Sequence, residues 1–374
     1  MARQFSAYHR RVRAALAIVL ALALPRAASL ERAQKLLWEH RYADAASIYR
    51  DLLRRAPNDA DARKGLATAE YWSGDFRAAL RDYELVLRAR PNDADARKAV
   101  SDIRAASAPV VVAETAAVHD DQPLRRAVAS TAYTQFIDPL TKWTATAGAY
   151  ALSAGARASA PFASVGIDAV LPAQHLHSAA ALRVFRFPDG EAKLLGGATL
   201  ARGAFSASID RHELLYTASS LQSHPYETTA TLAWKPSDDA AVALHEIRYF
   251  DANRGRAAEG YRLMRVSDAL SVGASAAYRD TDETRFDGVR YDPYWTPRNL
   301  FEARAVVAAS IKALRFHADG GWGRESSRSY HPWRASIDAN VPLRGAFTAT
   351  IGIEHQSTAF YRADAIRLGV SGRL

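Results

Sequence analysis

Cysteine is absent from this chain of 374 residues, and methionine occurs only twice. The lack of cysteine excludes a disulfide framework and any metal site that is built on thiolates. Beyond residue 24 the sequence also lacks a long apolar run, so we expect no membrane-spanning helix after the N-terminal segment. If this chain enters a membrane, it must therefore cross it with strands that close into a barrel.

A concentrated basic region is also missing, although the formal net charge is +9. The positive residues are mostly arginines that are scattered along the chain and interleaved with Asp and Glu. Nucleic-acid-binding proteins usually gather their basic residues into a patch or a stripe. We therefore expect no nucleic-acid partner.

Residues 1–28 have the parts of a secretory signal peptide. Arg3, Arg10 and Arg13 belong to a basic segment, residues 14–24 form an apolar segment, and small residues follow at Ala27 and Ala28. The alternative is an N-terminal anchor that is not cleaved. In both cases we expect the chain to leave the cytoplasm.

An internal repeat of 34 residues occupies residues 29–106. The octapeptide PNDADARK at residues 57–64 recurs unchanged at residues 91–98, and several landmarks keep the same offset. A small residue lets paired helices approach, and an aromatic residue fills the gap between them. A Pro-Asn-Asp turn ends one helix, and its Asp caps the next. The landmarks are Ala45 and Ala79, Tyr49 and Tyr83, Pro57 and Pro91, and Trp38 and Trp72.

This repeat resembles the tetratricopeptide repeat in its period and in the order of its landmarks. The resemblance implies two helical hairpins followed by a single capping helix. It also implies a role in binding a protein or a peptide, or in spacing two domains apart. Residues 107–126 have no such period, and we interpret them as a linker.

From residue 127 to residue 374 the sequence alternates between apolar and polar residues. In one segment Phe347, Ala349, Ile351 and Ile353 alternate with small or polar residues, and fifteen segments behave similarly. A period of two predicts strands with one apolar face and one polar face. Tight turns and long loops also alternate between these segments, as in outer-membrane barrels. Since bacterial barrels have even strand numbers, we expect twelve to fourteen strands.

The expected fold is therefore α+β, with a short α-solenoid followed by a transmembrane antiparallel β-barrel. A soluble sandwich or propeller is the alternative. Opposed charges on the polar faces favour a water-filled lumen, and aromatic residues at segment ends, such as Trp143 and Trp333, favour membrane interfaces. The predicted lumen-facing residues are Asp168, Arg279, Arg304, Arg315, Arg334, Asp338, Glu354 and Arg367.

A signal peptide, tetratricopeptide repeats and a barrel together resemble the exopolysaccharide export proteins and the YaiO-like outer-membrane family. The segments YDPYWTP at residues 291–297 and ELLYTASSL at residues 213–221 are similar to segments of this group. The resemblance implies a barrel in the outer membrane that assists export of a polysaccharide, with periplasmic repeats that dock a protein partner. A closed barrel that only anchors the repeats or the surface loops is the alternative.

The sequence carries few candidates for catalysis. His175 and His177 are expected on one strand face, and His317 and Asp319 are expected on the polar face of another, near Glu325. The sequence contains no glycine-rich phosphate loop and no hydrolase motif. We therefore expect no enzymatic activity, no cofactor and no metal. The lumenal arginines are expected to pair with acids across the barrel, and binding of an anionic glycan is the alternative.

Overall fold

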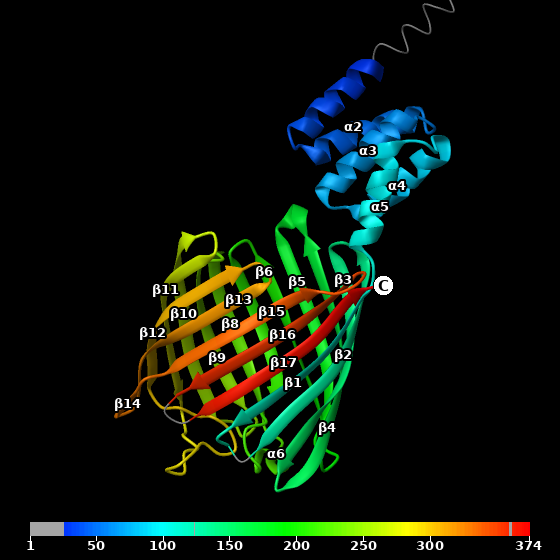
Figure 1. Cartoon of the computed structure of the whole chain (residues 1–374). Coiled ribbons are helices and arrows are strands. Elements are labelled where there is room, and N and C mark those ends of the chain that lie inside the picture. The colour runs from blue at the N-terminus through cyan, green and yellow to red at the C-terminus, as the bar shows by residue number, and fades with distance from the viewer. Residues whose placement is uncertain (1–25, 123, 359–360) are drawn as a thin grey trace, which may run out of the picture. The chain divides into compact units, whose positions relative to one another are not determined.

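The computed structural model describes residues 26–122, 124–358 and 361–374 (Figure 1). Most of the predicted signal peptide therefore lies outside the described residues. The chain divides into two compact units after Ser107. The first unit is helical, and the second is a β-barrel. No helix among the described residues is both long and apolar enough to cross a membrane.

The helical unit consists of consecutive antiparallel helices. Residues 26–38 are helical and are followed by α2 (Tyr42–Arg55), α3 (Ala60–Ser73), α4 (Phe76–Ala89) and α5 (Ala94–Ala106). Both repeated Pro-Asn-Asp turns act as the sequence predicts. The Asp59 carboxylate accepts hydrogen bonds from the backbone N–H groups of residues 61 and 62, and Asp93 accepts one from Ala96.

The repeat landmarks form the core of this unit. Ala45 and Ala79 are fully buried, and Tyr49 and Tyr83 are nearly so. The Tyr49 ring packs so closely on α3 that a Cβ on Gly65 would lie 2.2 Å from it. Pro57 and Pro91 stand in the turns that precede α3 and α5. The aromatic side chain therefore fills the space between helices, as the repeat pattern predicts.

The second unit is a single antiparallel sheet. Its strands follow one another in sequence, and with one exception each pairs with the next. The strands are β1 (Val110–Asp120), β2 (Arg125–Asp138), β3 (Thr141–Ala154), β4 (Ala156–Leu171), β5 (Leu176–Arg186), β6 (Ala192–Arg202), β7 (Phe205–Glu213), β8 (Tyr226–Ser237), β9 (Ala240–Tyr249), β10 (Arg254–Ser267), β11 (Leu270–Thr281), β12 (Leu300–Ile311), β13 (Leu314–Glu325), β14 (Arg328–Tyr330), β15 (Trp333–Pro342), β16 (Phe347–Ser357) and β17 (Arg362–Arg373).

The sheet closes into a barrel because β1 pairs with β17 along its whole length as well as with β2. The short strand β14 pairs only with the end of β13, and β13 continues to β15, so the wall has sixteen strands. The expected α+β fold with a barrel is confirmed. The soluble sandwich is wrong, because one closed sheet is present instead of two packed sheets.

Two details of the prediction need correction. The strand number is sixteen instead of twelve to fourteen. The linker predicted over residues 107–126 is wrong, because β1 occupies Val110–Asp120 within it. The alternation of apolar and polar residues in β1 is weak, because apolar residues stand on both faces. Ala113 and Ala117 point outward, and Val112 and Val118 point inward.

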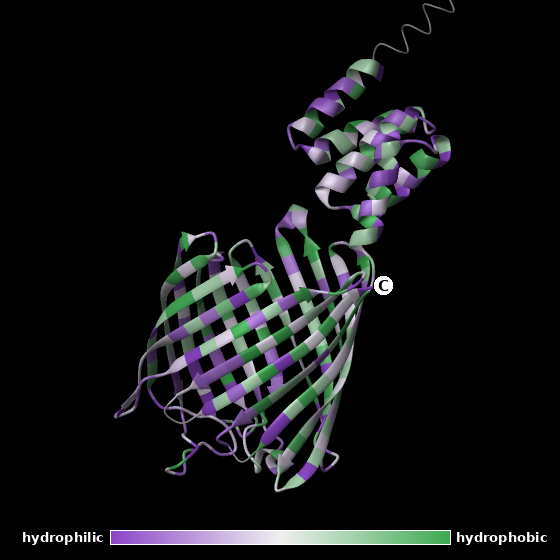
Figure 2. Cartoon of the chain, viewed as in Figure 1, coloured by the Kyte–Doolittle hydropathy of each residue, from purple (hydrophilic) through white to green (hydrophobic). Residues whose placement is uncertain are grey.

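Hydrophobic and hydrophilic residues alternate along the strands (Figure 2), and the two faces of the wall differ as a membrane requires. Large apolar side chains point outward, and Leu194, Leu232 and Ile353 expose more than half of their surface. Outward aromatic side chains such as Trp143 and Trp333 stand near strand ends. Alternate residues carry charged and small side chains into the lumen. This arrangement is that of a barrel in lipid with a polar interior.

The barrel has two unlike ends. We call the end with the hairpin turns after β2, β4, β6, β8, β10, β12 and β15 the turn end; β1 begins there, and β17 ends there. The opposite end carries α6 (Ser220–Ser223), β14 and the longest connection, residues 282–299, and we call it the loop end (Figure 1). The functional groups below lie in the lumen and toward the loop end.

The role of β1 gives a first prediction. A chain that begins at residue 108 should still form a closed barrel, because all sixteen strands remain. A chain that begins at residue 122 should fail, since β2 and β17 would be left with unpaired backbone groups in lipid. Gel mobility with and without heating distinguishes a closed barrel from an unfolded one. If both chains gave the same heat-dependent shift, β1 would be a linker after all.

Glu70 gives a prediction for the helical unit. Its side chain is 6 % exposed, and burial, together with the nearby Asp82 carboxylate, raises its pKa to about 7 despite the contact with Arg50 at 3.2 Å. Between the unfolded pKa of 4.5 and the folded pKa of about 7, the folded state holds a proton on Glu70 that the unfolded chain has lost. Stability therefore falls as the pH rises through this range and levels off above it.

The variant Glu70→Gln should therefore unfold about 5 °C higher than the wild type at pH 8, and at nearly the same temperature at pH 5. Thermal unfolding followed by circular dichroism at 222 nm reports the helices of the full chain. Glu84→Gln changes a more exposed glutamate that contacts Arg104, and it serves as the control. Equal gains at both pH values would contradict the assignment to Glu70.

Candidate functional site

The lumen collects the polar side chains that the sequence singles out. Alternation along the strands places all eight predicted residues on the inner face, between outward neighbours such as Ala303 and Ala305 around Arg304. On β4, Asp168 lies 2.8 Å from the His177 ring on β5. Arg315 stands opposite Asp338 in the register of β13 and β15, and Glu354 stands opposite Ser336.

Arg367 and Asp338 are joined across an intervening strand. The Arg367 guanidinium on β17 donates to the Asp338 carboxylate on β15 at 3.0 Å, over Gly352 on β16. A Cβ on Gly352 would lie 2.6 Å from that carboxylate oxygen, so only glycine leaves room for the pair. The ion pair thus follows the wall and does not span the lumen.

The strongest charged cluster lies on β12, β13 and β15. The Asp319 carboxylate is 2 % exposed and accepts from Arg304 at 2.6 Å, from Arg334 at 2.9 Å and contacts the His317 ring at 2.8 Å. Arg304 also donates to Glu302 at 2.5 Å. The lumenal arginines were expected to pair across the barrel, but these arginines instead pair with acids on the same or adjacent strands.

Arg279 marks a second cluster near the loop end. It donates to the Tyr249 hydroxyl at 2.7 Å and lies 3.5 Å from the Glu227 carboxylate. Its guanidinium also lies 4.7 Å from the centre of the Trp295 ring, which belongs to the connection 282–299. Arg279 therefore links the inner wall to a loop.

Two connections fold inward and narrow the loop end of the barrel. Tyr294 is fully buried and stacks on the inward Tyr249 ring at 4.4 Å between centres. Leu215, from the connection between β7 and β8, joins an apolar cluster with the inward residues Leu152 and Phe185. Side chains from both connections thus occupy space inside the wall.

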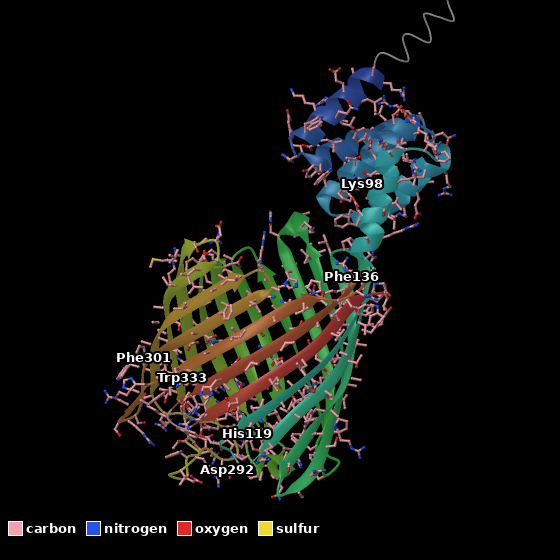
Figure 3. The ribbon with its side chains drawn as sticks, in the orientation of Figure 1. Lys98, His119, Phe136, Asp292, Phe301 and Trp333 are labelled. Atoms are coloured by element: carbon pink, nitrogen blue, oxygen red, sulfur yellow. The ribbon has the colours of Figure 1, made fainter. Side chains whose placement is uncertain are left out.

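Hydrogen bonds hold these connections to each other. Asp292, which is labelled in Figure 3, accepts from Thr217 at 2.5 Å and also from Ser219. The connection 282–299 is therefore tied to the connection after β7. The Tyr294 hydroxyl donates to Asp251 at 2.8 Å, and burial raises its pKa, which keeps the hydroxyl protonated as a donor. These hydrogen bonds order the two connections that narrow the loop end.

An aromatic pocket of about 460 Å³ lies beneath these connections. Tyr330 donates to the Glu302 carboxylate at 2.7 Å, and Tyr291 donates to Glu325, which is 6 % exposed. The second carboxylate oxygen of Glu325 has no hydrogen-bond partner among the described residues. The ring-bearing residues of this pocket are Tyr216, Tyr291, Trp295, Tyr330 and Tyr361.

A second cavity of about 520 Å³ adjoins the aromatic pocket. Both are lined by Glu302, Arg304 and Gln356, and the second cavity extends to Asp238 in the hairpin turn after β8. Since that turn belongs to the turn end, the two cavities follow the lumen from the turn end toward the loop end. The arrangement can accommodate an elongated polar ligand.

The histidine expectations have mixed outcomes. His317 and Asp319 are in contact, as expected, but Glu325 contacts Tyr291 and not this pair. The prediction that His175 and His177 share a strand face is wrong. His175 lies in the turn before β5 with a φ of 51°, and only His177 belongs to the strand. Within the described residues no group of His, Asp and Glu has the arrangement of a metal site.

Sequence reasoning missed most of the aromatic pocket. Glu302 could have been found, because it precedes Arg304 by two residues and shares its face. The segment 291–297 attracted notice only through its resemblance to export proteins. Nothing in the local pattern shows that Tyr291 and Trp295 fold back into the barrel, since that placement depends on contacts with distant strands.

Asp319 supports a quantitative prediction. The variant Asp319→Asn removes the charge that Arg304 and Arg334 share, so two partly buried guanidinium groups lose their common partner. We expect a loss of about 3 kcal/mol in the free energy of unfolding. Urea unfolding in lipid vesicles, followed by tryptophan fluorescence, measures it. Asp238→Asn, at a turn where the side chain is 98 % exposed, should have almost no effect; an equal loss in both variants would contradict the cluster's role.

Comparison with known proteins agrees with both units. A family model described as "Tetratricopeptide repeat" matches residues 36–103. A search of curated protein sequences finds no significant match. A solved structure titled "Bacterial polysaccharide outer membrane secretin" matches with 12 % identity and a TM-score of 0.51, over 72 % of this chain and 99 % of that chain.

Two further solved structures match this chain with TM-scores below 0.5. One is OccAB4 of Acinetobacter baumannii, with 9 % identity and a TM-score of 0.36, over 71 % of this chain and 97 % of that chain. The other is the translocator domain of the autotransporter NalP from Neisseria meningitidis, with 15 % identity and a TM-score of 0.27, over 76 % and 98 % of the two chains. The chain thus joins tetratricopeptide repeats to a closed sixteen-stranded β-barrel of the outer-membrane fold.

Proposed function

We propose that this protein carries a polysaccharide across the outer membrane through the lumen of its barrel. The observation that supports the proposal most directly is the pair of adjoining cavities that leads from Asp238 at the turn end to the aromatic pocket at the loop end. A small ligand would need only one enclosed pocket. An elongated path lined by polar groups suits a polymer.

The chemistry of the aromatic pocket suits sugar rings. The faces of pyranose rings carry C–H groups that pack against aromatic rings, and their hydroxyls donate to carboxylates. The pocket offers aromatic rings such as Tyr330 and Trp295 beside two carboxylates, Glu302 and Glu325. The free oxygen of the buried Glu325 is an acceptor that a sugar hydroxyl would satisfy.

The charge of the lumen favours a neutral polymer. Arg304 and Arg334 share Asp319, and Arg367 has Asp338 as its partner. Because these guanidinium groups already have acidic partners, an anionic glycan would have to compete with them. A neutral glycan can use the remaining hydrogen-bonding capacity without breaking an ion pair.

The helical unit has a surface for a protein partner. Trp38 and Trp72 occupy equivalent positions in the two repeats, and they are 85 % and 62 % exposed. Exposed tryptophans at repeated positions are typical of binding surfaces. We propose that the repeats lie in the periplasm, where a secreted chain would meet the proteins that deliver the polymer, and that a periplasmic protein docks on these two rings.

The structural comparison adds support of a general kind. The structure titled as a bacterial polysaccharide outer-membrane secretin matches this chain over 99 % of its own length, although its identity with this chain is only 12 %. The resemblance of the sequence to the YaiO-like family stays a prediction. This resemblance and the structural match are both consistent with a barrel that serves export.

A closed anchor is the second candidate, and a specific observation favours it. The connections 214–225 and 282–299 are tied to each other and buried in the loop end, so passage requires them to move. A barrel that never opens would instead present the repeats or its loops as a binding surface. The two candidates differ in whether removal of the connection creates a conducting path.

Planar bilayer recordings can test the proposal. We expect a low conductance for the full chain and a large, stable conductance for a variant that lacks residues 283–298. A neutral oligosaccharide should interrupt this current briefly each time it enters the lumen, because its sugar rings bind to the remaining aromatic side chains. The substitution Tyr330→Ala in the deletion variant should shorten the blocks several-fold.

Tyr133→Ala is the matched control, because Tyr133 lies on the outer face of β2 and should leave the blocks unchanged. A deletion variant that forms a heat-modifiable barrel without conductance would contradict transport and favour the anchor. Conductance without block by a neutral oligosaccharide would contradict a neutral polysaccharide as the cargo.

A further inference from the structure

The outer wall of the barrel is hollowed over β1, β2 and β3. A groove of about 890 Å³ lies there, flanked by Ile353 and Ile366 of β16 and β17. A second hollow of about 600 Å³ adjoins it toward the turn end, flanked by Ile351 and Leu368. These flanking side chains point outward and expose 43 to 56 % of their surface. We call the two hollows together the wall groove.

Small side chains form the floor of the wall groove. In one row across the strands, Ala117 of β1 stands opposite Ala127 of β2, which stands opposite Ala151 of β3. In the next row, Thr115 stands opposite Ala129. The surrounding wall carries the larger side chains of Leu, Ile and Val, so the apolar surface is recessed here. A ligand can therefore enter the recess without displacing a side chain.

A basic row closes the groove at the loop end. Arg125 of β2, Ser153 of β3 and Arg157 of β4 are aligned in the register and face outward. The two arginines are separated by two strand spacings, about 10 Å. Both are exposed, and within the described residues neither forms an ion pair. Asp364, also on the lining, lies 2.7 Å from His355.

An aromatic pair closes the groove at the turn end. The rings of Tyr133 and Trp143 lie 5.7 Å apart on the outer face of β2 and β3. From Arg125 to Tyr133 the strand rises about 26 Å along its own axis. At a strand tilt of about 40° this corresponds to about 20 Å along the membrane normal, which is most of the height of the apolar band of such barrels. The groove therefore spans much of the membrane and has cationic groups at only one end.

We propose that the wall groove binds a lipopolysaccharide molecule, with acyl chains in the recess and phosphates at Arg125 and Arg157. In outer-membrane barrels the longer loops face outward, so the basic row lies at the level of the outer-leaflet head groups. Arginine binds phosphate through two parallel hydrogen bonds. Two arginines on separate strands suit a head group that carries two phosphates, and the two adjoining hollows suit several chains.

A second copy of this chain fits the same surface less well. Copies in one membrane are related by an axis normal to its plane, so each residue keeps its depth. The basic row of one copy would then face the basic row of the other without an anionic group between them. A phosphate-bearing lipid instead supplies the charge that the row lacks.

Lipid retention by the full chain tests the proposal. The protein would be purified in a neutral detergent, incubated with purified lipopolysaccharide and analysed by native mass spectrometry. We expect one bound lipopolysaccharide per barrel, and at least a tenfold weaker retention for the double variant Arg125→Ala with Arg157→Ala. Filling the recess with Ala127→Leu and Ala151→Leu should weaken retention while both arginines remain.

The matched control is Arg324→Ala, which removes an outward arginine of β13 at the same end of the barrel but outside the groove. Heat-dependent gel mobility verifies that every variant forms a closed barrel. Equal retention by the wild type and the arginine double variant would overturn the proposal. Equal retention of phosphatidylglycerol would overturn lipopolysaccharide as the occupant, and a lipid-free dimer would show that a second copy occupies the groove.

Discussion

The pairing of β1 with β17 is the interaction on which the rest of the barrel depends. Hydrocarbon offers no partner to a backbone N–H or C=O group, so a sheet in lipid must have no edge. If residues 110–120 left the wall, β2 and β17 would both become edges, and the lumen would open to lipid along its length. The polar interior and its ion pairs exist only because this seam is closed.

Closure also explains why the lumenal charges pair along the wall. Once the strands are fixed in register, side chains on adjacent strands stand about 5 Å apart, which is within reach of a guanidinium and a carboxylate. Arg304, Asp319 and Arg334 occupy three neighbouring strands and meet without spanning the lumen. Gly352 lets Arg367 reach Asp338 across one strand more. The centre of the lumen is thereby left to the two cavities.

The sequence predicts what depends on local periodicity and misses what depends on tertiary contacts. The 34-residue period places the helices and the landmark Tyr49 in a core, and the alternation in β16 gives its two faces. Strand β1 escapes notice because apolar residues stand on both of its faces, Ala113 and Ala117 outward and Val112 and Val118 inward. Tyr294 lies 43 residues from its partner Asp251, so no local pattern indicates that this loop folds into the barrel.

Arg125 and Arg126 show how strictly the register assigns the two faces. Arg126 points inward, where it contacts Asp120 at 2.5 Å and donates to the carbonyl of Leu215 in an inward-folded loop. Arg125 points outward to the basic row of the wall groove. A slip of β2 by one residue would exchange them, leaving Asp120 buried without its cation and the loop without its donor. The free-energy cost of that exchange keeps β2 in register. The register of β2 therefore determines both the basic row of the wall groove and the contacts of the inward-folded loop.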